Sequence, residues 1–141
     1  MAKRGAYDPL KDSQYMSSQM KNFFEKILKS QAVELEKHGE KLKEGLHETY
    51  QPVPDDIDRS SAFSERLNEV KSYEHYQLMH QAITSALRRL RDGVYGYCLV
   101  TGEEIGLRRL LANPSATLCL EAQESKERQQ HQFRKISDRA S

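Results

Sequence analysis

Three carboxylates stand close together in residues 52–60 and are the first candidates for chemistry in this sequence. Two prolines precede Asp55, Asp56 and Asp58, and proline ends a helix because it lacks the backbone N–H and restricts the residue before it. Aspartate is also common in turns and at helix N-caps, so an inert turn is the simplest interpretation. The alternative is an exposed acidic site that enters a narrow cleft on another molecule. The residue types alone leave both interpretations open.

The two cysteines, Cys98 and Cys119, are the second candidates. Two are too few for a disulfide framework, so we expect reduced thiols that pack as small apolar residues. The histidines show no i, i+4 pair that faces a third metal ligand. The sequence also lacks a glycine-rich phosphate loop, a nucleophile elbow and a Cys/His dyad. These features argue against an enzyme.

Two long helices, one on each side of residues 52–60, must position the acidic stretch. Ser17 or Ser18 supplies an N-cap for the first helix, and apolar or small residues then recur with alternating spacings of four and three. This a/d pattern is typical of a coiled coil, with Lys and Glu at the other positions. The positions are Leu28, Ala32, Leu35, Gly39, Leu42 and Leu46.

The second helix is expected from near Ser60 to Asp92, where Gly93 can end it. Its seam again alternates by three and four, and a second apolar group lies nearer its start, displaced from the seam by a step of three. The seam comprises Tyr73, Tyr76, His80, Ile83, Leu87 and Leu90, and the displaced group comprises Phe63, Leu67 and Val70. Two such helices predict an antiparallel hairpin with residues 52–60 at its tip.

The rest of the chain differs in character. Residues 93–122 carry glycines, tyrosines and both cysteines, and predict a small globular module with a short β-hairpin. Residues 123–141 are polar and predict a C-terminal helix and tail. Residues 1–16 lack periodicity and predict a flexible arm, which leaves 17–92 as the coiled-coil hairpin. The sequence therefore predicts a mainly α fold in four parts.

The composition restricts the partners. Twenty-two Lys and Arg against 21 Asp and Glu give a net charge of +1, which disfavours nucleic-acid binding through bulk positive charge. Hydrophobic residues make up 37% of the chain and Trp is absent, which fits long solvated helices better than a large core. No signal peptide or run of roughly 20 apolar residues is visible, so we expect a cytoplasmic protein without a membrane anchor.

The segments 93–98, 102–110 and 113–119 follow the hairpin and keep glycines, paired arginines and a cysteine in register. Together with the hairpin they resemble the DksA/TraR family of bacterial RNA polymerase-binding transcription factors, over about Met16 to Arg134. The resemblance implies a finger that enters the secondary channel of RNA polymerase and places its tip near the catalytic Mg²⁺, without recognising DNA sequence. It further implies shorter-lived open complexes at ribosomal RNA promoters and regulation of other promoters.

The family's tip signature, Asp-x-x-Asp-x-Ala, falls on Asp55 and Asp58, with Ser60 where alanine is usual. The resemblance therefore makes these three the residues that face the polymerase active site, while Asp56 stays a solvated turn residue. Arg109 matches the arginine expected to support docking on the polymerase.

The resemblance also implies ppGpp as a candidate co-regulator, bound between the factor and the polymerase rim. By register, the family's basic residues at that site correspond to Ala82, Asn113 and Gln123, none of which is basic. The arginines nearest these positions in the motif are Arg88, Arg89, Arg108 and Arg109.

The family's zinc site is a Cys-x-x-Cys pair followed by a second such pair. Here the four positions read Cys98, Thr101, Cys119 and Ala122, whereas a structural Zn²⁺ needs four nitrogen or sulfur ligands. The resemblance thus indicates a member that has lost zinc and requires no cofactor. Its module must be stabilised by packing against the helix bases, and the side chains expected there are Tyr95, Tyr97, Ile105, Leu107, Leu110, Leu118 and Leu120.

These expectations describe a monomeric transcription regulator of the stringent response that is not an enzyme. One alternative is a factor like the Gre proteins, in which acidic residues on a finger hold a second Mg²⁺ in the polymerase and stimulate transcript cleavage. The other alternative is a plain coiled-coil adaptor with an inert acidic turn.

Overall fold

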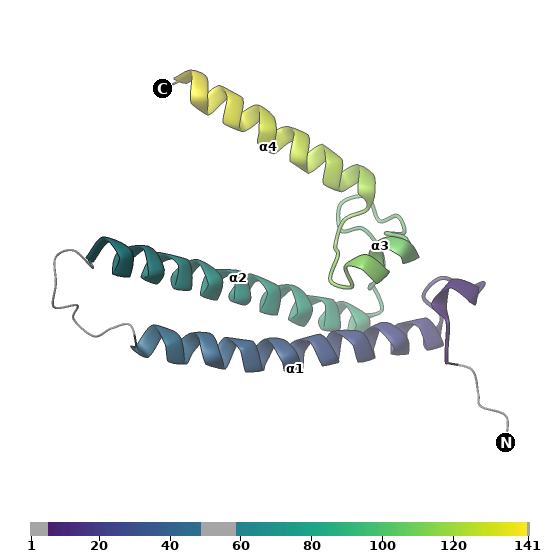
Figure 1. Cartoon of the computed structure of the whole chain (residues 1–141). Helices are drawn as coiled ribbons and strands as arrows, with labels where there is room; N and C mark the ends of the chain where they lie inside the picture. Colours follow the sequence, from purple (N-terminus) through teal and green to yellow (C-terminus); the bar gives the residue numbers. More distant parts are fainter. Residues whose placement is uncertain (1–5, 49–58, 141) are drawn as a thin grey trace.

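A computed structural model describes residues 6–48 and 59–140 of the chain. Its elements are the 3₁₀ helix η1 at Pro9–Lys11, followed by α1 (Ser18–Glu48), α2 (Arg59–Asp92), α3 (Leu107–Ala112) and α4 (Leu120–Ala140). Figure 1 shows α1 and α2 side by side as a long antiparallel hairpin, with α3 and its loops at one end and α4 projecting from there. The predicted mainly α fold with a long hairpin is confirmed. Among the described residues, no helix has the length and apolar character that crossing a membrane requires.

The ends of the two hairpin helices follow from local chemistry. Ser17 caps α1, because its hydroxyl oxygen accepts a hydrogen bond from the backbone N–H of Met20 at 3.2 Å. After the last turn of α2, Gly93 adopts a φ of +78°, and the backbone N–H of Val94 donates to the carbonyl of Arg89 at 3.0 Å. A left-handed glycine after the last turn is a common helix stop, as the sequence predicted.

The a/d seam of the hairpin matches the prediction in α1 and in the basal part of α2. Among the predicted seam residues, Leu28, Gly39 and Ile83 are buried and the others are half-buried. A buried glycine, Gly39, lets the ring of Tyr76 approach so closely that a Cβ at this position would overlap the ring. The glycine therefore sets the spacing of the two helices at this level.

Nearer the start of α2 the prediction was wrong. The half-buried positions continue the alternation of three and four without a break, through Ala62, Arg66 and Glu69. The apolar group expected to form a displaced seam is exposed instead: Phe63 is 68%, Leu67 44% and Val70 42% accessible. A seam assigned from hydrophobicity alone lies one residue away from the observed seam. The reason is that two long polar side chains, Arg66 and Glu69, occupy the observed seam in this part of the finger.

The main core lies at the base of the hairpin, where the module packs on the two helices. Its largest fully enclosed side chains come from α1, from the loop after α2 and from α3, and they are Met20, Phe24, Leu28, Tyr95 and Leu110. Of the seven side chains expected in this core, Tyr95, Ile105 and Leu110 are buried and Leu107 and Leu118 pack partly against them. The other two, Tyr97 at 37% and Leu120 at 59% accessible, lie at its edge.

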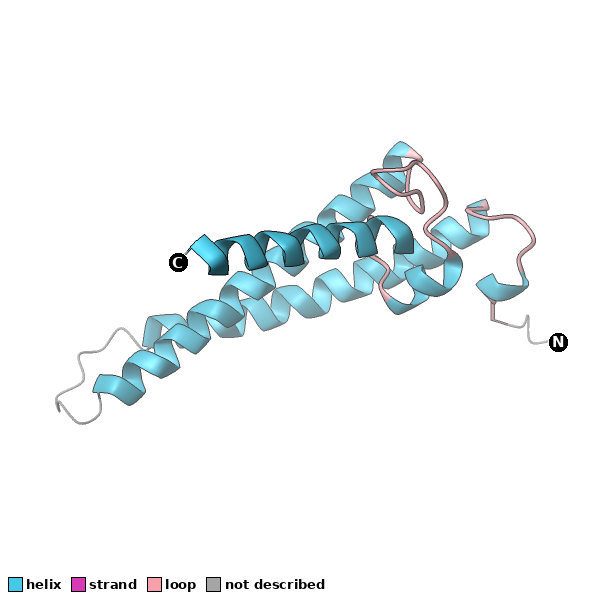
Figure 2. Cartoon of the chain, turned by 90° about the horizontal axis from the view of Figure 1, so that it is seen from above, coloured by secondary structure: helices cyan, strands magenta, loops and turns pink. Residues whose placement is uncertain are grey.

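The predicted β-hairpin of the module is reduced to a single antiparallel bridge between Tyr97 and Glu104, and no strand is assigned among the described residues. Figure 2 shows this region as loops next to α3. The backbone N–H of Cys98 donates to the carbonyl of Glu103 at 2.7 Å, and that of Ile105 donates to Gly96 at 2.9 Å. The segment is too short to extend the ladder, because α3 begins two residues after Ile105.

Residues 6–16, expected as part of a flexible arm, are packed against the base and the module, and we call them the N-terminal strap. Met16 is 6% accessible and lies on Gly96. Asp12 anchors the strap to the start of α1, because its carboxylate accepts hydrogen bonds from the hydroxyls of Tyr7 (2.7 Å) and Ser17. The contact of Met16 with Gly96 joins residues far apart in sequence, so periodicity could not reveal it.

The C-terminal helix begins at Leu120, three residues before the expected start at 123, and stands apart from the hairpin. Helix α4 reaches Ala140, and beyond Gln123 its described residues are exposed. Phe133 and Ile136, on adjacent turns, are 76% and 66% accessible. In Figures 1 and 2, α4 points in the general direction of the hairpin tip without lying on the hairpin.

Candidate functional site

Of the three residues expected at the tip, the structure describes only Ser60. Asp55 and Asp58 lie outside the described residues, and Ser60 lies in the first turn of α2. Helix α1 has 31 residues and α2 has 34, so at about 1.5 Å per residue the helices carry their ends roughly 45–50 Å from the base. The hairpin is therefore a finger that holds the start of α2 at a distance from the folded core (Figure 1).

The four positions of the expected zinc site come together in the module. Cys98 and Cys119 are buried, with 3% and 7% of their surfaces accessible, and both are free thiols. The Thr101 hydroxyl lies 3.7 Å from Cys119 Sγ and also forms a hydrogen bond with the Cys98 thiol. Ala122, at the fourth position, is buried and contributes a methyl group. The donors are thus two thiols and one hydroxyl.

The Cys98 sulfur sits in a hydrogen-bonding cradle. Burial alone raises the pKa of a thiol, because it disfavours the charged form. Here the hydrogen bond from Thr101 and the backbone N–H groups of Cys119, Thr101 and Val100 outweigh burial and lower the pKa of Cys98 to about 6. These hydrogen bonds favour the thiolate form of Cys98.

The N-terminal strap packs against the module and forms hydrogen bonds with two of its loops. Tyr15 donates its hydroxyl to the Gly96 carbonyl at 2.6 Å and accepts the backbone N–H of Gly106 at 3.3 Å. Its ring also meets Tyr97 edge to face, with centroids 5.8 Å apart. Tyr95 makes a comparable closure, because its buried hydroxyl donates to the carbonyl of Pro114 at 2.6 Å. Two tyrosine hydroxyls thus hold the loops that carry the cysteines.

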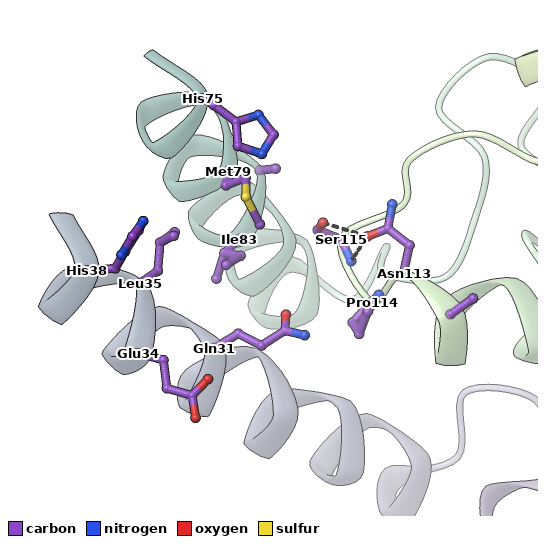
Figure 3. Close-up of a pocket in the computed structure, with 12 residues that line it drawn as sticks. Gln31, Glu34, Leu35, His38, His75, Met79, Ile83, Asn113, Pro114 and Ser115 are labelled. Carbon is purple, nitrogen blue, oxygen red and sulfur yellow. Dashed lines mark hydrogen bonds between the residues drawn. The ribbon is translucent and has the colours of Figure 1, made fainter. Parts of the chain in front are cut away.

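The positions expected to bind an alarmone divide between two places. Ala82 and Asn113 line one groove of about 760 Å³ between the two hairpin helices and the loop after α3, whereas Gln123 instead donates to Glu127 on α4 at 2.9 Å. Figure 3 shows the loop residues Asn113 to Ser115 on one side of the groove and α2 on the other. The groove lining includes His38, His75 and Glu34 but no lysine or arginine.

Two of the four arginines considered for this site have roles inside the fold. Arg109 donates its Nε–H to the carbonyl of Leu118 at 2.8 Å, which ties α3 to the loop before α4. Arg89 is 7% accessible, and burial lowers the pKa of its guanidinium. The other two, Arg88 and Arg108, are exposed. None of the four lines the groove of Ala82 and Asn113.

Comparison with known proteins shows which protein family has this architecture. Residues 93–128 match the model of the prokaryotic dksA/traR C4-type zinc finger. The "RNA polymerase-binding transcription factor DksA" of Caulobacter vibrioides is 33% identical over 95% of this chain and 94% of the relative. The chain belongs to the DksA/TraR family. The DksA of Haemophilus influenzae is 30% identical over 82% of this chain and 79% of its own length.

A solved structure supports the same assignment. Transcription factor DksA2 from Pseudomonas aeruginosa superposes with a TM-score of 0.76 at 38% identity, covering 85% of this chain and 92% of that chain. The membership predicted from the motifs at 93–119 is therefore confirmed. Both the finger and the module are part of the likeness, because the matched share exceeds either alone.

The C4 zinc finger of the DksA/TraR family does not fit the donors found here. A four-coordinate structural Zn²⁺ takes four nitrogen, sulfur or carboxylate ligands. Within residues 6–48 and 59–140, no group of three or more His, Cys, Asp or Glu side chains is placed to hold a metal ion. In the register expected from the sequence, Thr101 and Ala122 occupy two of the four ligand positions, and the thiols there are Cys98 and Cys119.

Sequence reasoning missed the residues that take part in closing the module. Tyr15 and Met16 belong to the strap, and neither lies in a periodic segment or a recognised motif. Thr101 was read only as a lost ligand, although its hydroxyl contacts both thiols. The available signal was the glycine at position 96, whose positive φ and close approach to Met16 require a residue without a side chain.

Proposed function

We propose that this chain is a transcription regulator that binds RNA polymerase by inserting the α1–α2 finger into the secondary channel. The observation that supports this most strongly is the 33% identity over nearly the whole length of a relative named as an RNA polymerase-binding transcription factor. The finger supports it geometrically, because its helices hold Ser60 roughly 45–50 Å from the core. Such a shape reaches into a deep, narrow opening.

In this proposal Asp55, Asp58 and Ser60 form the part of the finger that faces the polymerase active site. Their role is to destabilise open complexes at ribosomal RNA promoters and to modulate other promoters. Arg109 supports docking at the base, where it already orders α3 against the segment before α4. The protein acts as a monomer in the cytoplasm, does not recognise DNA sequence, and is not itself an enzyme.

We also propose that the regulator works without zinc. The donor set at Cys98, Thr101, Cys119 and Ala122 supports this, as does the closure of the same loops by Tyr15 and Tyr95. The role of ppGpp is that of a candidate co-regulator. The groove beside Ala82 and Asn113 offers no lysine or arginine to its phosphates, which favours a weak response.

The decisive test is in vitro transcription from a ribosomal RNA promoter with the Asp58→Asn variant. We expect this variant to lose repression while it still binds polymerase, because the change removes one charge at the tip and leaves the docking base intact. Asp56→Asn is the matched control and should repress as the wild type does. Equal repression by wild type and Asp58→Asn would reject a functional tip and favour the adaptor alternative.

A second assay separates regulation from catalysis. Backtracked elongation complexes are incubated with the wild-type protein, and transcript cleavage is followed. We expect no stimulation. Cleavage that depends on Asp55 or Asp58 would instead support the Gre-like alternative. Running the promoter assay with and without ppGpp, in the presence of a chelator, measures the alarmone response and zinc independence in the same experiment.

A further inference from the structure

An apolar stripe on the far part of α2 lies outside the seam of the hairpin. It consists of Phe63, Leu67 and Val70, all of them exposed, and we call it the α2 stripe. Spacings of four and three residues place its members on one face of the helix. Each member follows a seam position by one residue, so the stripe is turned by about 100° from the face that packs on α1. This face of the finger is accessible to solvent.

The hairpin alone does not account for this arrangement. Two long polar side chains, Arg66 and Glu69, occupy neighbouring seam positions, whereas the apolar side chains stand outside. A coiled coil is stabilised by apolar residues in its seam, so the reverse arrangement lowers the stability of this part of the finger. Single exposed apolar residues are ordinary, but several on one face of a helix mark an interaction surface.

The residues that border the stripe indicate the chemistry of the surface that covers it. Ser64, Asn68 and Lys71 line its side away from the seam, and all three are exposed. A surface that binds a phosphate backbone needs clustered cations, and this border has one. An apolar centre with a mostly uncharged polar border is instead typical of contacts between proteins. The covering surface is therefore an apolar protein surface.

The position of the stripe excludes helix α4 as its cover. Along α2 the stripe lies about 33 to 44 Å from the basal end of the helix, at 1.5 Å per residue. The exposed apolar residues of α4, Phe133 and Ile136, lie only about 20 and 24 Å from the start of that helix, which is at the base. They would fall short of Val70 even if α4 lay along the hairpin (Figure 1).

A second copy of the chain is also a poor cover. Three partly exposed side chains offer a few hundred Å² per chain, whereas a stable interface buries about 800 Å² of each partner. The stripe is therefore too small to hold two chains together by itself. Its size suits an additional contact in a complex that other parts of the protein also hold together.

A partner that contacts only the base or the module does not reach this part of the finger. A partner that receives the finger lengthwise does, and under the function proposed above that partner is RNA polymerase. We propose that the α2 stripe packs against an apolar protein surface inside RNA polymerase and strengthens binding there. This inference rests on the proposed function. The stripe contributes affinity, while the regulatory effect belongs to the tip.

The test is a competition assay with purified RNA polymerase holoenzyme, in which unlabelled variants displace a fluorescently labelled wild-type chain. The triple variant Phe63→Gln, Leu67→Gln, Val70→Gln should bind about 10-fold more weakly or worse, because it removes the apolar surface from the contact. Val70→Gln and Val33→Gln form a matched pair, since the two valines are 42% and 53% accessible and Val33 lies on α1, nearer the base. Only Val70→Gln should weaken binding.

Three further measurements complete the test. The free variants should match the wild type in circular dichroism and thermal unfolding, because the substituted side chains are exposed. At saturating concentration the triple variant should still repress a ribosomal RNA promoter, since its tip is intact. The photo-crosslinking variant Leu67→p-benzoylphenylalanine should attach to a protein subunit of the polymerase.

Several outcomes would overturn the role of the α2 stripe while the proposed function stands. They are wild-type affinity of the triple variant, equal losses from Val70→Gln and Val33→Gln, crosslinks to nucleic acid alone, and a bound triple variant that does not repress at saturation. A dimer of the free chain that dissociates in the triple variant, measured by sedimentation, would assign the stripe to a second copy instead. A wild-type chain that does not bind the polymerase would overturn both this inference and the proposed function.

Discussion

Replacing Tyr15 by Phe tests whether the N-terminal strap holds the module together. The change keeps the ring, which meets Tyr97 edge to face, and removes only the hydroxyl. That hydroxyl joins two loops of the module, because it donates to Gly96 O at 2.6 Å and accepts from Gly106 N at 3.3 Å. These contacts span 81 and 91 residues of sequence, so they fix the strap to the far part of the chain.

The expected loss of stability depends on which hydrogen bonds Gly96 and Gly106 retain when the Tyr15 hydroxyl is removed. The Gly96 carbonyl retains the hydrogen bond from Ile105 N at 2.9 Å, so it stays satisfied. The Gly106 N–H has only the tyrosine oxygen as its acceptor among the described contacts. Losing one hydrogen bond costs about 1 kcal/mol, and leaving a partly buried donor without an acceptor adds about another. We expect a loss of about 2 kcal/mol, which lowers Tm by roughly 6 °C in a chain of this size.

The assay is thermal unfolding in EDTA, followed by circular dichroism. Tyr97→Phe is the matched control, because it removes the hydroxyl of the other ring in the pair, which is 37% accessible, and keeps the edge-to-face contact. We expect its Tm to stay within about 1 °C of the wild type. If the two variants melt at the same temperature, the strap does not stabilise the module through this hydroxyl.

Three further predictions concern the glycines of the finger, the two cysteines of the module and the effect of pH. Gly45→Ala should raise the free energy of unfolding in urea by about 0.5–1 kcal/mol, because a Cβ there meets no atom within 4 Å. Gly39→Ala is the contrasting variant and should give no gain or a loss, because its Cβ overlaps the Tyr76 ring. Cys98→Ser and Cys119→Ser should keep the wild-type helical content at neutral pH, with or without chelator; unfolding of the wild type by EDTA would disprove zinc independence. The pKa of Cys98 falls from 9.0 to about 6 on folding, so the unfolded chain binds more protons than the folded chain between pH 6 and 9. The stability of the wild type should therefore rise across this range relative to Cys98→Ser. If the urea midpoints of the two proteins differ by the same amount at every pH, the hydrogen bonds do not stabilise the thiolate.

The hairpin could be predicted because its signals are local. Capping by Ser17, the stop at Gly93 and the a/d spacing each depend on residues within one or two turns. The exception is the part of α2 near the tip, where the seam shifts by one residue from the apolar positions. A pattern of hydrophobicity cannot identify a seam built from Ala62, Arg66 and Glu69, because those side chains look like surface residues.

The candidate site was predictable only in part, because its structure depends on contacts between residues far apart in sequence as well as on local motifs. The motif around Cys98 and Cys119 predicts which zinc-ligand positions carry other residues, and this prediction concerns residue types alone. How the module is closed depends on contacts between the strap and loops more than 80 residues away, and no local pattern encodes them. The roles of Asp55 and Asp58 at the tip stay predictions, because both lie outside the described residues.

The way this module is closed has a consequence for the whole finger. A zinc ion would join the two cysteine-bearing loops to each other and leave the module self-contained. Here Tyr15 joins the module to the segment that leads directly into α1, and Tyr95, which follows α2, packs on Phe24 of α1 with centroids 5.6 Å apart. These contacts attach the module to the base of the finger. A perturbation of the module is therefore transmitted to the two helices that present the tip, because they share one core.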